Sequence, residues 1–254
     1  MTEPIRLSEA PPLADCSLCA HRDSLLAAGR CQPGDICVAA HSGRQIDRFM
    51  RFNPEFAQDY LADIFWERRA IAVRYAPREA VIALVSDRDE VVRRAVATRL
   101  SPEELALLMR DPDREVRITV AARIVPEMLP RLMADPDYMV RLQVAHRIAH
   151  GSLPKMAHDP DREVRKEVAR RLPPFALSRL AGDEDPEVRR IAASRMLPDD
   201  AASMLYDDEW LVRLEAVARA PLASLARMEN DPEAEVRDRV RERLNGNRNN
   251  EDET

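Results

Sequence analysis

One motif recurs at a constant interval along this chain. Its clearest copies begin at Asp111, Asp135 and Asp159, and all three read Asp-Pro-Asp-x-x-Val-Arg-x-x-Val-Ala-x-Arg followed by Ile or Leu. The same interval gives further starts at Asp63, Asp87, Asp183, Asp207 and Asp231. A unit this short cannot bury its apolar face alone, so neighbouring units have to stack. The sequence therefore predicts a solenoid of eight 24-residue repeats over residues 63–244.

The first half of each repeat is predicted to be an amphipathic α-helix. In the unit that begins at Asp111, the residues Val116, Val120 and Ile124 follow one another at four-residue spacing, as on the buried face of a helix. Asp111 is the expected N-cap, with Pro112 at the first helical position. In most units a proline shortly after the last apolar residue ends the helix.

The second half of each repeat is short and has apolar residues three positions apart. These pairs are Leu105/Leu108, Leu129/Leu132, Leu153/Met156, Leu177/Leu180 and Leu225/Met228. Only about eight residues remain before the next unit, and side chains three apart fall in line in a 3₁₀ helix. No unit shows the alternation of a β-strand. The predicted fold class is therefore all-α, with long α-helices alternating with short α or 3₁₀ helices.

Two columns of arginine follow the same period. The first column, directly after a valine, contains Arg93, Arg117, Arg141, Arg165, Arg189, Arg213 and Arg237, and the second contains Arg99, Arg123, Arg147, Arg171, Arg195, Arg219 and Arg243. The first column falls inside the apolar arc of the helix, where an unpaired charge would be strongly destabilising. The main interpretation is a stacked ladder in which each arginine binds an aspartate or a helix-end carbonyl of a neighbouring unit. The alternative is a groove that grips phosphates or an acidic partner.

All four cysteines lie in one short stretch, as Cys16-x₂-Cys19-x₁₁-Cys31-x₅-Cys37. In a reducing compartment such a cluster predicts a metal site rather than disulfides, in a Cys-rich domain over residues 1–44. Structural zinc prefers paired Cys-x₂-Cys ligands, and only the first pair has that spacing. Iron–sulfur clusters accept more varied spacings. Spacing alone leaves structural zinc and a [4Fe–4S] cluster open.

The segments that flank the repeats have distinct compositions. Residues 45–62 are rich in aromatic and aliphatic residues and are broken by Asn53-Pro54, so they predict two short helices that connect the Cys-rich domain to the first repeat and cap it. Residues 245–254 contain no apolar residue and are predicted to be a disordered tail. The stretch that ends near Asp15 is expected to form an extended lead-in, without the apolar region of a signal peptide.

The repeat motif resembles that of the leucine-rich repeat variant family, in which two layers of helices form a right-handed superhelix without strands. The resemblance covers residues 63–244, although the first unit has Arg68 where a valine is expected and is interpreted as a cap. Members of this family carry an N-terminal iron–sulfur domain held by four cysteines. The resemblance therefore implies a [4Fe–4S] cluster bound by Cys16, Cys19, Cys31 and Cys37.

Other candidate sites in the sequence are weak. It contains no phosphate-binding Gly-rich loop, nucleophile elbow or catalytic triad, so the protein is not expected to be an enzyme. His146 and His150 are four apart, but no acidic residue accompanies them at a recognised spacing. His21 and His41 could replace a thiolate in a zinc site and are expected to be bystanders of the four thiols. No apolar run is long enough to span a bilayer, and a cytoplasmic protein is expected.

The charge of the chain helps to rank the possible functions. A formal net charge of −6 argues against general nucleic-acid binding. The favoured function is a scaffold whose concave repeat surface binds a protein partner, with the cluster as a structural or redox-responsive addition. The alternatives are an electron-transfer protein whose repeats dock partners, and a nucleic-acid-binding regulator that uses the arginine columns.

Overall fold

The computed structural model describes residues 14–251, and the side chains of residues 14–246. The predicted lead-in therefore lies almost entirely outside the described residues. Within residues 14–251 the chain forms helices and turns, with no strand and one isolated bridge between Gln32 and Ile36. None of the helices in this part of the chain combines the length and apolar character needed to cross a bilayer. The fold divides between Val125 and Pro126 into two compact units, which are described separately.

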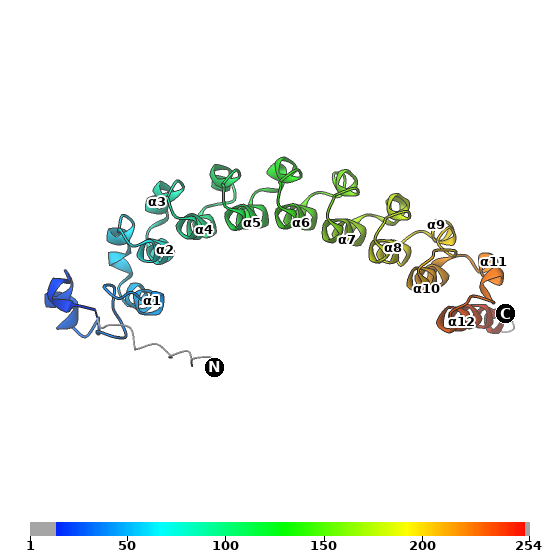
Figure 1. The fold of residues 1–254 in the computed structure, drawn as a ribbon, viewed down its shortest axis with the longest axis horizontal. Helices are drawn as coiled ribbons and strands as arrows, with labels where there is room; N and C mark the ends of the chain where they lie inside the picture. The colour runs from blue at the N-terminus through cyan, green and yellow to red at the C-terminus, as the bar shows by residue number, and fades with distance from the viewer. Residues whose placement is uncertain (1–13, 252–254) are drawn as a thin grey trace, which may run out of the picture. The chain divides into compact units, whose positions relative to one another are not determined.

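The first unit contains the cysteine segment, the connector and the first repeats (Figure 1). Its elements are η1 (Cys16–Leu18), η2 (Arg22–Leu26), α1 (Gly43–Phe52), η3 (Pro54–Tyr60), α2 (Trp66–Tyr75), α3 (Arg78–Val81), η4 (Ile82–Leu84), α4 (Glu90–Arg99), η5 (Glu104–Leu108) and α5 (Arg114–Arg123). The two short helices expected in the connector are α1 and η3, separated at Asn53.

The second unit consists of alternating long and short helices. Its elements are η6 (Pro126–Leu132), α6 (Tyr138–Arg147), η7 (Leu153–Met156), α7 (Arg162–Arg171), η8 (Pro174–Leu180), α8 (Pro186–Ala193), α9 (Pro198–Ala202), α10 (Trp210–Arg219), α11 (Leu222–Leu225), η9 (Ala226–Met228) and α12 (Ala234–Glu251). The long helices α6, α7, α8, α10 and α12 lie side by side in one layer and the short helices form a second layer (Figure 1). The predicted all-α fold of alternating long and short helices is confirmed.

The core of each repeat is the predicted apolar stripe. In α6, Val140, Val144 and Ala145 have no exposed surface, and Leu153 from η7 is equally buried. Val140 and Val144 are one helical turn apart and therefore point to the same face, toward the short helix. Fully burying one such side chain stabilises the fold by roughly 1.5–3 kcal/mol. The repeats are therefore held together by aliphatic side chains rather than by aromatic ones.

The helix start differs from the prediction by two positions. The expected N-cap was the first aspartate of each repeat, such as Asp111, but α5 begins at Arg114 and its N-cap is Asp113, which accepts a hydrogen bond from the backbone N–H of Val116 at 3.0 Å. Asp111 instead accepts from the backbone N–H of Asp113 at 2.9 Å. The prediction was wrong because the carboxylate of Asp111 is already bound to an arginine of the preceding repeat, Arg93.

The first arginine column forms the predicted ladder. Arg141 donates from Nε and Nη2 to the two carboxylate oxygens of Asp159 at 2.8 and 2.9 Å, and from Nη1 to the backbone carbonyl of Asp135 at 2.8 Å. The same two-pronged contact with an aspartate 18 residues later is made by Arg69, Arg93, Arg165, Arg189 and Arg213. Each of these arginines thus joins its own loop to the next repeat. Arg69 belongs to the first 24-residue repeat, which the sequence pattern did not include in the column. The ladder therefore extends one repeat further than predicted.

The second arginine column binds the ends of the long helices. Arg171 donates from Nη1 to the carbonyl of Ala145 at 2.5 Å and from Nη2 to that of Ile148 at 2.9 Å. The last carbonyls of an α-helix have no partner inside the helix, and these arginines supply one from the following repeat. Arg99, Arg123, Arg195, Arg219 and Arg243 make equivalent contacts. Both columns are therefore committed to contacts within the fold.

The C-terminal part of the chain is helical where the sequence predicts disorder. Helix α12 begins at Ala234 and continues to Glu251, past the expected end of the repeats at residue 244. No proline occurs within this range, and Gly246 is its single glycine, so the helix begun by the last repeat meets no strong terminator. The remainder of the predicted tail, residues 252–254, lies outside the described residues.

Candidate metal centre

The first cysteine pair lies in a sequence of tight turns. The carboxylate of Asp15 caps η1 by accepting from the backbone N–H of Ser17 at 2.8 Å. The backbone N–H of Cys19 then donates to the carbonyl of Cys16 at 3.3 Å, and that of Arg22 donates to the carbonyl of Cys19 at 3.1 Å. These turns bring Cys16 and Cys19 to one side of the segment and start η2 directly after them.

The second cysteine pair lies on a small hairpin-like turn. Gln32 and Ile36 exchange backbone hydrogen bonds of 2.8 and 2.9 Å. Gly34, between them, has a φ of 83°, in the left-handed region that glycine adopts without strain. The turn places Cys31 and Cys37 immediately outside the bonded pair. The wide spacing between these two cysteines, which a zinc knuckle does not have, is thus the length of this turn.

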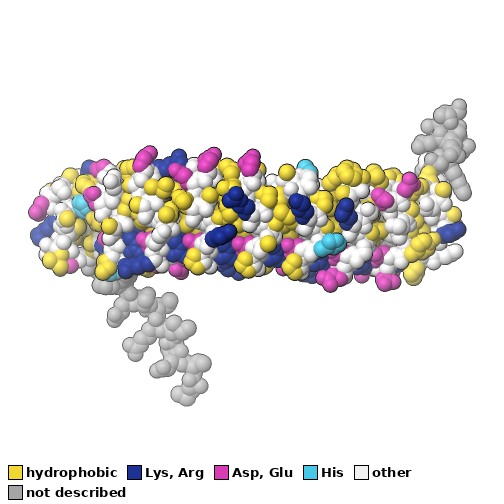
Figure 2. Space-filling view, turned by 90° about the horizontal axis from the view of Figure 1, so that it is seen from above, with side chains coloured by type: hydrophobic (Ala, Val, Ile, Leu, Met, Phe, Trp, Pro, Cys, Tyr) yellow, Lys and Arg dark blue, Asp and Glu magenta, His cyan; other side chains and the backbone are white. Residues whose placement is uncertain are grey.

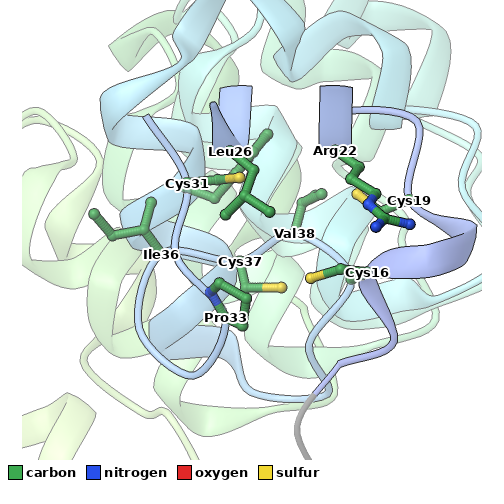
Figure 3. Close-up of a pocket in the computed structure, with 11 residues that line it drawn as sticks. Cys16, Cys19, Arg22, Leu26, Cys31, Pro33, Ile36, Cys37 and Val38 are labelled. Carbon is green, nitrogen blue, oxygen red and sulfur yellow. The ribbon is translucent and has the colours of Figure 1, made fainter. Parts of the chain in front are cut away.

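All four predicted ligands line one pocket (Figure 3). Cys16, Cys19, Cys31 and Cys37 come from the two turns, and the rest of the lining is apolar apart from one arginine. The other lining residues are Arg22, Leu26, Pro33, Ile36, Val38, Ala39 and Phe49. Cys37 is buried, and the other three cysteines are half-buried. The folding of residues 14–42 therefore gathers the four thiols that the spacing only suggested.

The closeness of the four thiols changes the pKa values of Cys31 and Cys37. Burial raises the pKa of the Cys31 thiol, and the charges of the three other cysteines raise it further. Burial also raises the pKa of Cys37, but the nearby backbone N–H groups of Ala39 and Ala40 act in the opposite direction. Four thiolates this close together repel one another unless a cation lies between them. Hydrogen bonds to a ligand sulfur are one of the means by which a protein tunes an iron–sulfur cluster.

The donor set fits an iron–sulfur cluster by its chemistry. Four thiols in an apolar pocket supply the Cys₄ ligand set of such clusters. The four sulfurs line one pocket, as Figure 3 shows.

The histidines do not take part in this pocket. His21 is buried, is within 2.7 Å of the hydroxyl of Tyr60 through its Nε2, and packs edge-on against Phe56. His41 packs against Phe65 with ring centroids 5.6 Å apart. Neither histidine lines the thiol pocket. On α6, His146 contacts Glu167 at 2.9 Å through Nδ1 and belongs to no metal-binding group among the described residues.

Two residues of the centre have no signal in the repeat pattern or in the cysteine spacing. Asn53 is fully buried and donates to the backbone carbonyls of Arg30 and Phe49, each at 3.0 Å. It thereby ties the second cysteine turn to α1. Arg22 lines the thiol pocket. Its position three residues after Cys19 is the one signal in the sequence, and it is a weak one because arginine is frequent in this chain.

Comparison with known proteins agrees with both parts of the fold. Residues 12–59 match a family model described as "LRV protein FeS4 cluster", and residues 91–113 and 162–185 match "Leucine rich repeat variant". A solved structure titled "A leucine-rich repeat variant with a novel repetitive protein structural motif" is 55% identical, with a TM-score of 0.85, over 90% of this chain and 98% of that chain.

A curated relative matches a smaller part of the chain. It is the 27.7 kDa protein of the nifB 3′ region of Rhodobacter capsulatus, 38% identical over 86 residues, which make up 34% of this chain and 35% of the relative. The match thus spans about a third of the length of that protein. The fold, the family models and the match along nearly the whole solved structure all agree on the family. The chain belongs to the leucine-rich repeat variant family and carries that family's N-terminal iron–sulfur cluster domain.

Proposed function

We propose that Cys16, Cys19, Cys31 and Cys37 bind a [4Fe–4S] cluster and that the repeats form a scaffold for a protein partner. The observation that carries the first part is the single pocket lined by all four thiols. The bound cluster would supply one-electron redox chemistry at this end of the chain. The four cysteines would hold the cluster, and apolar side chains would limit the access of water to it. Val38 is buried, and Leu26 and Ile36 line the same pocket. Thiols that serve as ligands require a reducing compartment, and we propose the cytoplasm.

Iron and sulfide analysis tests the cluster assignment. The full-length chain, purified without air, should contain about four iron atoms and four acid-labile sulfides per chain, as a Cys₄-bound [4Fe–4S] centre requires. It should also be brown and lose its visible absorption on chelation. Stoichiometric zinc in a colourless protein would contradict the assignment and leave a structural zinc site in its place.

The scaffold role is supported by how the arginines are used. The donor groups of both arginine columns are bound to aspartates and to helix-end carbonyls, which weighs against the alternative in which the same groups grip phosphates. Figure 2 shows the side of the short helices, where basic and acidic side chains lie interspersed with apolar ones. A mixed surface of this kind is poorly suited to a polyanion. We propose a non-enzymatic role for the repeats.

The layer of long helices in the second unit is the proposed partner surface. Arg190 of α8 donates to Glu187 at 2.7 Å and to Glu215 of α10 at 3.1 Å, so the charged groups there are paired across helices. Leu211 is 37% exposed and lies four positions before Glu215, on the same face of α10. Leu211 is thus an apolar anchor with paired charges beside it, as in an interface whose apolar core is bordered by a polar rim.

A matched pair of variants tests this surface. Leu211→Asp should reduce the capture of a specific protein from anaerobic cell extract by roughly tenfold, the effect of losing one apolar anchor. Phe175→Asp adds the same charge in η8, in the short-helix layer, where Phe175 is 72% exposed, and it should leave capture unchanged. Loss of capture in Phe175→Asp alone would place the partner on the other layer.

An electron-transfer role is the second candidate, because the thiol pocket lies near the surface. Cys16 and Cys19 are half-buried, and Leu18 between them is 87% exposed. A cluster held there would be accessible to a redox partner. Reversible reduction of the bound cluster at a physiological potential would favour this role over a purely structural one.

A further inference from the structure

One charged side chain lines the thiol pocket within the described residues, and it belongs to Arg22. Arg22 is the first residue of η2, and its backbone N–H is bound to the carbonyl of Cys19 at 3.1 Å. This hydrogen bond fixes the position of Arg22 relative to the first cysteine pair. Arg22 is exposed, and Figure 3 shows its guanidinium group at the edge of the pocket, beside Cys19 and on the side of Cys16.

The guanidinium of Arg22 differs from its neighbours in having no hydrogen-bond acceptor within residues 14–246. Arg30 is bound to Glu55 and to the carbonyl of Phe52, and Arg48 is bound to Asp35. Asp15 is affected by the charge of Arg22, but its carboxylate is bound to Ser17 through two hydrogen bonds. The positive charge of Arg22 is therefore available to a group bound among the thiols.

A positive charge beside Cys16 and Cys19 would affect the redox chemistry of a cluster bound by the four thiolates. A cluster held by four thiolates is anionic, and its reduction adds one electron without breaking a covalent bond. A nearby cation stabilises the more negative, reduced form, and net charge and hydrogen bonds to sulfur are the factors that set the potential. A guanidinium also offers several N–H donors in a plane, which suits sulfur acceptors around a cluster.

We infer that Arg22 raises the reduction potential of the cluster by placing its charge and N–H donors against the cluster at the Cys16/Cys19 side. This inference rests on the proposed [4Fe–4S] assignment. It assigns Arg22 a role in tuning the centre and assigns the binding itself to the four cysteines.

A redox titration of the full-length protein tests the role of Arg22. Arg22→Gln removes the charge and keeps a polar side chain, whereas Arg22→Leu keeps the aliphatic lining. Both should shift the midpoint potential downward, by about tenfold in the reduction equilibrium, or about 59 mV for one electron. Arg22→Lys retains the charge and should stay closer to the wild type. The potential is measured by electron paramagnetic resonance during titration with dithionite and a mild oxidant, after iron and sulfide content has been matched.

The control is Arg51→Gln, which makes the same charge change on α1. Arg51 is exposed and does not line the pocket, so its loss should leave the potential unchanged. If Arg22→Gln and Arg22→Leu load the full cluster and titrate like the wild type, or shift no more than Arg51→Gln, the inference is overturned. If the wild-type chain itself contains no iron and sulfide, the cluster assignment fails instead, so the two failures are distinguishable.

Discussion

Replacing Arg141 with alanine should lower the free energy of unfolding of the second unit by about 3–5 kcal/mol, the range for removing one partner of a buried ion pair. Arg141 and Asp159 are each 8% exposed, and the three hydrogen bonds of the guanidinium join two repeats. Its loss leaves the carboxylate of Asp159 buried without its counter-charge. Chemical denaturation followed by far-UV circular dichroism measures the total effect, and hydrogen exchange at α6 and α7 locates it.

The control for this prediction is Arg162→Ala, one repeat further along. The side chain of Arg162 is 66% exposed, and its closest carboxylate contacts, with Glu163 and Asp185, are both 3.4 Å long. Exposed pairs of this kind contribute little, so the change should stay within about 0.5 kcal/mol. Equal effects of the two substitutions would show that the ladder is no more important than surface charge. A repeat array can unfold in parts, which is why the exchange measurement accompanies the denaturation curve.

The periodic part of this fold could be predicted from the sequence because every repeat meets the same environment. The apolar positions of α6 and α7, in successive repeats, are buried in the same way, and the short helices were expected from three-residue spacing. The helix start was not predictable to the residue. Asp111 and Asp113 are both good capping residues, and only the contact with Arg93, 18 residues earlier than Asp111, decides which of them caps α5.

The four thiols of the pocket could be singled out from the sequence, whereas the other residues around them could not. Four cysteines in one segment indicate a metal site by residue type alone. Asn53 and Arg22 act through contacts that no period or spacing encodes, since Asn53 reaches a carbonyl 23 residues earlier and Arg22 is placed by the turn after Cys19. His21 likewise finds its partner in Tyr60, 39 residues away. Non-periodic contacts of this kind emerge only once the chain has folded.

Replacing Cys37 with alanine should abolish cluster binding and unfold residues 14–42, while the helices of the second unit persist. Cys37 is the most buried of the four thiols, and its backbone N–H is bound to the carbonyl of Gln45 at 3.3 Å. The segment buries few apolar side chains of its own, chiefly Leu25 and Val38. Structural zinc in small peptides supplies about 10–16 kcal/mol of apparent binding free energy, and a four-thiolate cluster is expected to be comparably important to a segment with so small a core.

The expected results follow from this imbalance between ligand and core. The variant should lose nearly all iron, sulfide and visible absorption, and amides of residues 14–42 should exchange at rates close to those of an unfolded chain. Chelation of the wild-type protein should produce the same pattern, whereas amides of α6 to α10 should keep their protection, since each repeat is stabilised by its neighbours. Leu18→Ser is the control, because Leu18 lies between two ligands but is 87% exposed and should retain the cluster. Retained protection of residues 14–42 in Cys37→Ala would mean that this segment folds without the cluster, and the cluster would then be an addition to a preformed pocket rather than the source of its stability.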